Sequence, residues 1–330
     1  MEIYYCGADI TPYISANGFE LSIRPCFRSS LRFALLRPDV SAADFPSLAA
    51  GGEVRAVVNG SAVFGGIVTS LGYGYFGGAM RVNAVCEGYE QICRRRVVTG
   101  FSSSGTTAGA VSRDLFDYAL AAEGISTAAD SFDSGVSISG YSSEPARLGD
   151  LFDDIAATSG MKWWITPSKV FYMRSSIDVG ESGLYINANT VSDKVRNLTL
   201  TKTLSGYRNS HTAVGNGVWI SARTPSEESR MAALFGTGKY GGITVNKRLE
   251  SAVACGMAAS AVLGAHNTEP ETLRFDTGET EAALYSRVWF RDIGANIYQP
   301  YVVKEIKITL KNGFDYSVTA ERYDPNVIRP

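Results

Sequence analysis

One segment, residues 148–173, constrains the fold more than any other part of the chain. Its first half, LGDLFDDIAATSG, spaces apolar residues as on one face of a helix and stops at Gly160, a typical helix end. Its second half, KWWITPSKVFYM, places Thr166-Pro167-Ser168 between two short apolar runs, which predicts a β-hairpin. Trp163 and Trp164 are adjacent and point to opposite faces of a strand, so we expect at least one to be core. The segment therefore predicts a helix followed directly by a hairpin.

Residues 1–97 are predicted to form strands. Apolar and polar residues alternate in two stretches between residues 19 and 35, which indicates strands with one buried and one solvated face. Asn59-Gly60 separates two further runs and is a strong hairpin signal, because both turn positions favour positive φ. A glycine-rich loop is expected around residues 72–78, followed by a strand from Met80 to Tyr89. About six antiparallel strands of this size suggest a small barrel or sandwich.

Residues 98–194 differ from the rest in charge. They carry 6 basic and 12 acidic side chains, a net charge of −6, whereas residues 1–97 total +1 and residues 195–330 total +3. This distribution supports a separate domain and disfavours sequence-specific nucleic-acid binding, which needs a concentrated basic face. A helix is predicted from about Ala108 to Ala122, with Gly124 as its stop.

Residues 195–330 return to strands, interrupted by a helical insertion near 224–266. Within the insertion, Pro225 to Phe235 (N-cap Thr224) and Leu249 to Leu263 are predicted helices. The chain is therefore predicted to be mainly β with an α+β insert, as two small antiparallel β-barrels flanking a helix-and-hairpin domain. The strands expected here are Leu198–Thr203, His211–Ala222, Thr272–Phe275, Tyr301–Leu310 and Phe314–Glu321, with a second Asn-Gly hairpin at Lys311-Asn312-Gly313.

The sequence gives little support for any catalytic residue. Asp150, Asp153 and Asp154 fall on the solvated face of a predicted helix, whereas glycosidase chemistry needs one carboxyl in an apolar pocket beside an ionised one. His211 and His266 have no nucleophile, carboxylate or cysteine at a recognisable spacing, and no phosphate-binding loop occurs. We therefore expect no enzymatic activity, no catalytic or metal site and no cofactor.

Arg94-Arg95-Arg96 is the one basic run. It could supply ion pairs at a subunit interface, where arginine is well suited, or it could be a solvated strand end. A nucleic-acid role is disfavoured because no aromatic residues interleave with it. The run is kept as a candidate subunit-interface site.

The sequence shows neither a membrane-spanning segment nor a secretion signal. No apolar run approaches the roughly 20 residues needed to cross a bilayer, and the first residues lack a secretion signal. Five scattered cysteines, an odd number, are consistent with a reducing compartment. We expect synthesis in a bacterial host's cytoplasm and no membrane-spanning role.

Several sequence motifs, which occur in the same order, resemble motifs of the central hub proteins of tailed-bacteriophage tails and baseplates. Besides the segment above, they are RVNAVCEGYEQICRRRVVTGFSSSGTTAGAVSRDLFDYALAAEGI (Arg81 to Ile125), FGGIV (Phe64 to Val68) and GYRNSHTAVGNG (Gly206 to Gly217). Glu87-Gly88 and Ile92-Cys93 depart from the family pattern but conserve polarity. The resemblance implies a homotrimer whose two barrels per chain form a pseudo-sixfold ring in the virion tail tip or baseplate.

The resemblance also implies partners. The ring would join a distal tail-tube ring protein to a tail fibre or spike, and would let the tape-measure protein and genomic DNA pass without holding either. Because the chain stops at Pro330, where many family members extend, we expect the fibre or spike to be a separate protein. The alternative is a β-rich carbohydrate-binding or carbohydrate-degrading tail protein.

Overall fold

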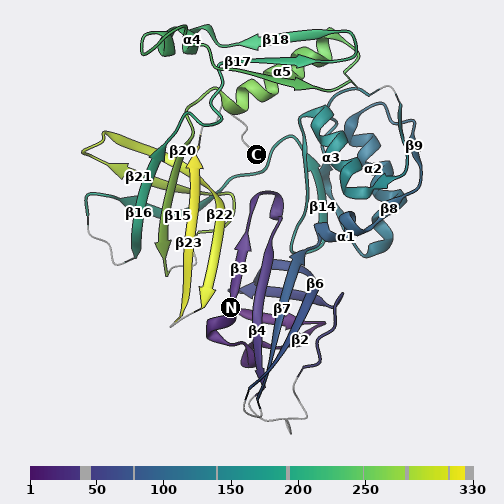
Figure 1. Ribbon diagram of the computed structural model, residues 1–330, viewed down its shortest axis with the longest axis vertical. Coiled ribbons are helices and arrows are strands. Elements are labelled where there is room, and N and C mark those ends of the chain that lie inside the picture. The colour runs from purple at the N-terminus through teal and green to yellow at the C-terminus, as the bar shows by residue number, and fades with distance from the viewer. Residues whose placement is uncertain are drawn as a thin grey trace.

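The computed structural model describes residues 1–37, 46–76, 79–138, 140–190, 194–247, 249–278, 282–310 and 313–323. Four parts are visible in Figure 1: a first β-lobe at the bottom, a helix-and-hairpin domain on the right, a second β-lobe on the left, and an outer layer (residues 210–266) along the top. Strands dominate both lobes, and most helical residues lie in the other two parts. The predicted class, mainly β with an α+β insert, is confirmed.

The first β-lobe is antiparallel throughout. Asn59 and Gly60 have φ of 49° and 79°, and Val58 pairs with Ser61, so the predicted hairpin is confirmed. The glycine-rich loop expected at residues 72–78 is wrong, because residues 72–76 continue a long strand paired with the next one. Its strands are β1 (Glu2–Tyr5), β2 (Ala8–Asp9), β3 (Glu20–Ile23), β4 (Ser30–Arg37), β5 (Glu53–Val58), β6 (Ser61–Phe76) and β7 (Ala79–Gly88).

The helix-and-hairpin domain confirms the predictions for residues 148–173. A helix ends at Gly160, which has φ of 69°, and the hairpin follows at once. Trp163 and Trp164 are both buried: Trp163 packs on Phe152 and Trp164 stacks on Tyr172. The elements are α1 (Glu90–Arg95), β8 (Val97–Val98), β9 (Phe101–Ser103), α2 (Ala108–Ala119), β10 (Ser126–Phe132), β11 (Tyr141–Ser143), β12 (Ala146–Arg147), α3 (Leu148–Ser159), β13 (Lys162–Ile165) and β14 (Val170–Arg174).

The second β-lobe is joined to the first by backbone hydrogen bonds. Its strands are β15 (Gly180–Asn187), β16 (Val195–Lys202), β20 (Glu271–Thr277), β21 (Ser286–Asp292), β22 (Ile297–Leu310) and β23 (Phe314–Arg322). One edge of β22 pairs first with β21, over residues 297–302, and then with β3, over residues 306–309. Among the described strands the pairing order therefore runs through both lobes, from β16 to β2. The predicted second hairpin is confirmed, because β22 and β23 pair up to Leu310 with Phe314; turn residues 311 and 312 lie outside the described residues.

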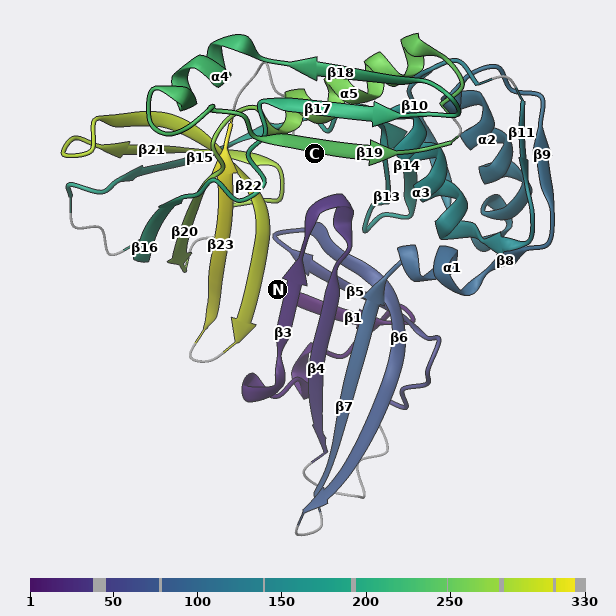
Figure 2. The same cartoon turned by 45° about the horizontal axis from the view of Figure 1, so that its top comes forward.

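The outer layer is a three-stranded sheet backed by a helix, as Figure 2 shows. Its elements are β17 (Ser210–Val214), β18 (Trp219–Arg223), α4 (Pro225–Ala232), β19 (Gly241–Val245) and α5 (Ala252–His266). The single strand expected at 211–222 is wrong. Gly217, with φ of 75°, and a bond from the Gly215 N–H to the Val218 carbonyl (2.7 Å) reverse the chain there. None of the described helices is long and apolar enough to cross a membrane.

Three groups of buried apolar residues hold the molecule together. The largest runs through both β-lobes and includes Phe33 and Phe64 from the first with Phe275 and Tyr301 from the second. A second fills the helix-and-hairpin domain, and a small third lies under α5. The boundaries at 97/98 and 194/195 stay predictions.

Candidate functional site

The basic run Arg94-Arg95-Arg96 closes α1 and is not a strand end, so that alternative is wrong. Cations are favourable in the last turn of a helix, where carbonyl groups lack partners. Arg95 Nη2 lies 3.2 Å from Glu123 Oε2, and Arg96 Nη1 lies 2.6 Å from Glu123 Oε1. Two of the three arginines are therefore bound within the chain. In the described part of the chain, Arg94 makes no ion pair.

Arg94 borders a cleft of about 600 Å³ between the first β-lobe and the helix-and-hairpin domain. Glu90, from the first turn of α1, is buried in its wall, and burial raises the pKa of this carboxyl to about 7 despite Arg94 and Arg28 nearby. Burial also lowers the pKa of Lys162, across the cleft. The other lining residues are Arg24, Pro25, Cys26, Ser29, Ser30, Glu87, Asp153, Ala156, Met161 and Trp163.

Of the three aspartates on α3, two make specific contacts. Asp153 accepts a hydrogen bond from Trp163 Nε1 (2.7 Å) and pairs with Arg28 of the first β-lobe (3.2 Å). Asp154 accepts one from the Tyr141 hydroxyl (2.9 Å). The sequence interpretation of all three as solvated residues is therefore incomplete. Asp153 links two parts of the molecule.

A second contact between these parts lies at the hairpin tip. Lys169 Nζ lies 3.0 Å from Glu53 Oε2, and the Tyr89 hydroxyl donates to the same carboxylate. The approach is close, because a Cβ on Gly65 would lie 2.5 Å from the Pro167 carbonyl oxygen. Two polar contacts, at Asp153 and at Glu53, thus fix the helix-and-hairpin domain against the first β-lobe.

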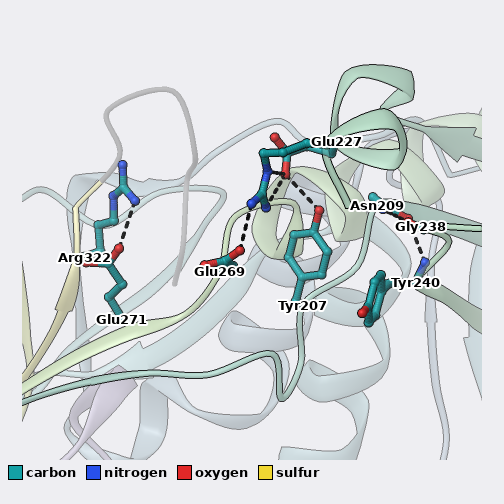
Figure 3. A network of polar contacts seen from close by, with 9 residues as sticks. Tyr207, Asn209, Glu227, Gly238, Tyr240, Glu269, Glu271 and Arg322 are labelled. Carbon is teal, nitrogen blue, oxygen red and sulfur yellow. Dashed lines mark hydrogen bonds and ion pairs between the residues drawn. The ribbon is translucent and has the colours of Figure 1, made fainter. Parts of the chain in front are cut away.

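Gly206–Gly217, singled out in the sequence without a role, supplies a polar network (Figure 3). Buried Asn209 donates to the Gly238 carbonyl (2.6 Å) and accepts from the Tyr240 N–H (2.8 Å). The Tyr207 hydroxyl donates to Glu227 Oε2 (2.8 Å). These bonds tie α4 and the chain entering β19 to the segment before β17.

The network continues to the root of the outer layer. Arg230 on α4 bonds Glu227 (2.9 Å) and Glu269 (2.9 Å), which lies just before β20. Close by, Glu271 is buried and pairs with Arg322 at 3.1 Å (Figure 3). Burial would raise the pKa of Glu271, but hydrogen bonds from Tyr301 and Lys202 hold it below its usual range. The Arg230–Glu269 ion pair thus links α4 to the segment that enters the second β-lobe.

Groups for catalysis or metal binding are sparse. The described residues contain no cluster of three or more His, Cys, Asp or Glu that could hold a metal ion. His211 Nε2 lies 2.9 Å from Thr244 Oγ1, and burial lowers its pKa. The cysteines are free thiols, and burial raises the pKa of both Cys86 and Cys93 to about 12, so neither is a ready nucleophile.

No known sequence family and no curated protein matches the chain. Solved structures do. The 43 kDa tail protein of prophage MuSo2 from Shewanella oneidensis has a TM-score of 0.73 at 10% identity, covering 100% of this chain and 99% of that one. The tail protein of Neisseria meningitidis MC58 gives 0.72 at 13%, covering 100% and 98%. A component of the E. coli type VI secretion system, described as similar to bacteriophage T4 tail proteins gp27 and gp5, gives 0.64 at 9%, covering 100% and 79%.

Proposed function

We propose that this chain, which has the fold of phage tail proteins along its whole length, is a non-enzymatic structural hub of a tail tip or baseplate. The observation that carries the proposal is the match of fold over 100% of this chain and 99% of a prophage tail protein. The hub resemblance noted in the sequence agrees with it. Its place would be the virion tail of a phage or a phage-derived particle.

The assembly would be a homotrimer. A sixfold tail tube can be met by a threefold ring when each chain presents two similar units, and this chain has two β-lobes. Both lobes share one core, which would hold their relative position fixed. We propose that six such lobes face the tube-end ring protein, and that a separate fibre or spike binds the other side.

The ring's opening would pass DNA and the tape-measure protein. The formal net charge of −2 for the whole chain suits a passage, because each phosphate-bound Lys or Arg would add affinity that slows ejection. Arg94 is the member of the basic run available for a neighbouring subunit, since Arg95 and Arg96 are paired with Glu123.

Light scattering on the purified chain tests the proposal. We expect a particle of three times the 35.4 kDa chain mass, in equilibrium with the monomer. A chain that stays monomeric at every concentration and does not join a purified tail tube would contradict it.

One surface favours the alternative of carbohydrate binding. Tyr185 and Tyr298, 48% and 66% exposed, border a cleft of about 440 Å³ on the second β-lobe, with Arg291 and Asn296 beside them. Trp289 stacks against Tyr298 at 5.4 Å between ring centroids. Exposed rings beside polar groups can bind sugars. Titration with defined bacterial surface oligosaccharides tests this alternative. Binding that is lost in Tyr298→Ala would support it, and no binding would contradict it.

A further inference from the structure

The outer layer exposes an unusual share of large apolar side chains. Seven of the sixteen that are exposed among the described residues lie in it, and Phe235 is 86% exposed. Among the described residues, its own core cluster has four buried members. Exposed apolar groups gathered in this way are typical of a protein interface. The seven are Trp219, Leu234, Phe235, Ile243, Val245, Val253 and Met257.

The strand register collects three of these side chains on one face. Val214 pairs with Trp219 on one side and with Val245 on the other, while Thr212 lies beside Ile243. Paired residues share a face of a sheet, so Trp219, Ile243 and Val245 project together. The neighbouring positions Ala213 and Ile220 pack with α5 on the opposite face. We call the side that carries Trp219 the open face.

The open face is apolar with a positive border. β17, β18 and β19 contain no Asp or Glu, and Arg223 alternates onto the same face as Trp219. Lys239 and Lys247 are exposed just before and after β19. Within the described chain, none of these three cations forms an ion pair. A partner surface should therefore be apolar with carboxylates around it.

The helix-and-hairpin domain offers such a surface. From Glu90 to Arg174 the domain carries 10 acidic and 8 basic side chains, a net charge of −2. Its carboxylates include Asp114 and Asp117, which α2 exposes beside Tyr118, itself 57% exposed. This domain and α4 lie at opposite sides of the molecule, as Figures 1 and 2 both show, whereas the end of β19 adjoins the domain at α3, where Asn246 Nδ2 donates to Thr158 Oγ1 (3.3 Å). That contact uses α3, so α2 is the surface that a second copy could present to the open face.

We propose that the open face of one copy docks on the α2 side of the helix-and-hairpin domain of the next, head to tail. This inference rests on the proposed trimer, since a closed ring needs a surface and its complement on every chain. Opposite charge at the border would set the orientation, and the apolar centre would supply most of the affinity.

Sedimentation velocity on the full chain tests it, with Trp219→Ser combined with Ile243→Ser. Both side chains are 68% exposed, so we expect an unchanged melting temperature. We expect the dissociation constant to rise at least about 30-fold, as for loss of an aromatic hot spot. The matched control, Tyr73→Ser with Tyr75→Ser, removes exposed rings from β6 and should leave association unchanged.

Charge reversal gives an independent readout. Arg223→Glu and Asp117→Arg should each weaken association, and both effects should shrink at high salt, because border charges are screened. The two reversals combined in one chain should recover part of the lost affinity.

The outcomes separate the inference from the proposed function. A wild-type trimer whose serine variant associates equally well overturns the inference and leaves the hub intact. A wild-type chain that never associates overturns the inference, and it overturns the hub as well if it also fails to join a purified tail tube. If the serine variant still forms trimers but loses binding to a tube-ring protein, the open face belongs to that protein and the inference is wrong.

Discussion

The helix-and-hairpin domain and the outer layer both combine helices with a small sheet, yet they are stabilised differently. The first buries 23 residues in one cluster, where Phe171 contacts four other aromatic rings. The second buries four, and leaves its sheet open on one face. The first can rely on its own core. The second depends on a polar network and on whatever covers it.

Their helices show the same contrast. α3 buries one side and exposes the other, as expected for a helix at the surface of a core. α5 has no Asp, Glu, Lys or Arg in 15 residues, yet Val253 and Met257 are exposed. A helix that is apolar all round is normally covered all round. The difference agrees with the proposal that the layer is covered by a second copy.

The largest effect is expected from the aromatic core. Phe171→Ala should lower the free energy of unfolding by about 3–5 kcal/mol, because it leaves a cavity among packed rings. Denaturant unfolding of the monomeric chain measures this. Tyr118→Ala, an exposed ring of the same domain, should cost little. A small loss at Phe171 would mean that this domain, like the layer, depends on contacts outside its core.

Glu90 should give the helix-and-hairpin domain a pH dependence. Its pKa is raised to about 7 from an ordinary 4.5, so the folded state binds the extra proton between those values. Stability should therefore fall as pH rises from about 4.5 to 7, by on the order of 2–3 kcal/mol. In denaturant titrations over this range, Glu90→Gln should lack this loss of stability. An equal slope in both proteins would exclude Glu90 as the source.

The outer layer should respond to pH in the opposite direction. Burial lowers the pKa of His211 below its ordinary 6.5, so the unfolded state binds the proton more readily. The layer should lose stability as pH falls below about 6.5. Hydrogen exchange of β17 and β19 at several pH values measures this locally, with His211→Gln as the control.

The polar network should contribute less to the free energy of unfolding than the aromatic core does. Each of its contacts should contribute more than a surface ion pair. Asn209→Ala leaves the buried Gly238 carbonyl and Tyr240 N–H without their partner, which should cost about 1–3 kcal/mol. Hydrogen exchange should quicken in β19 and α4, not in α3. Asn216→Ala, exposed in the same layer, is the matched control. Uniform quickening over the whole chain would show that the layer is not a separate unit.

The smallest effect is expected at the basic run. Arg96→Ala removes one of two arginines from Glu123, both partly exposed, and should cost at most about 1 kcal/mol. Arg94→Ala should leave unfolding unchanged, so any change in association would identify Arg94 as an interface residue. If Arg94→Ala changed neither unfolding nor association, Arg94-Arg95-Arg96 would have no role at an interface.

Turns and helix ends could be predicted from the sequence, because they depend on the backbone preferences of a few neighbouring residues. Asn59-Gly60 and Gly160 adopt the positive φ that their residue types favour, and the hairpin after α3 follows from its turn residues. Residues 72–76 were misassigned because glycines there stay in a strand when a neighbouring strand supplies their hydrogen bonds. That pairing is a tertiary contact.

The candidate sites depended still more on distant contacts. The sequence indicates that Arg94-Arg95-Arg96 lies at a surface. It does not show that Arg96 pairs with Glu123, which is 27 residues away. It gave no reason to join Asp153 to Arg28, 125 residues apart. The open face was missed because strand β19 was assigned to a helical insertion. Alternation of Ile243 and Val245 was the signal that could have found it.

The junction between β22 and β3 has a mechanical consequence. Four residue pairs, from Ile306 with Ile23 to Thr309 with Glu20, connect the lobes along the strand direction. A force pulling the lobes apart along that direction would load these bonds together, in shear, and would have to break them all at once. The helix-and-hairpin domain lies between the two lobes in the sequence and is held to the first lobe by the Arg28–Asp153 and Lys169–Glu53 ion pairs. The two lobes would therefore resist separation as one stiff unit.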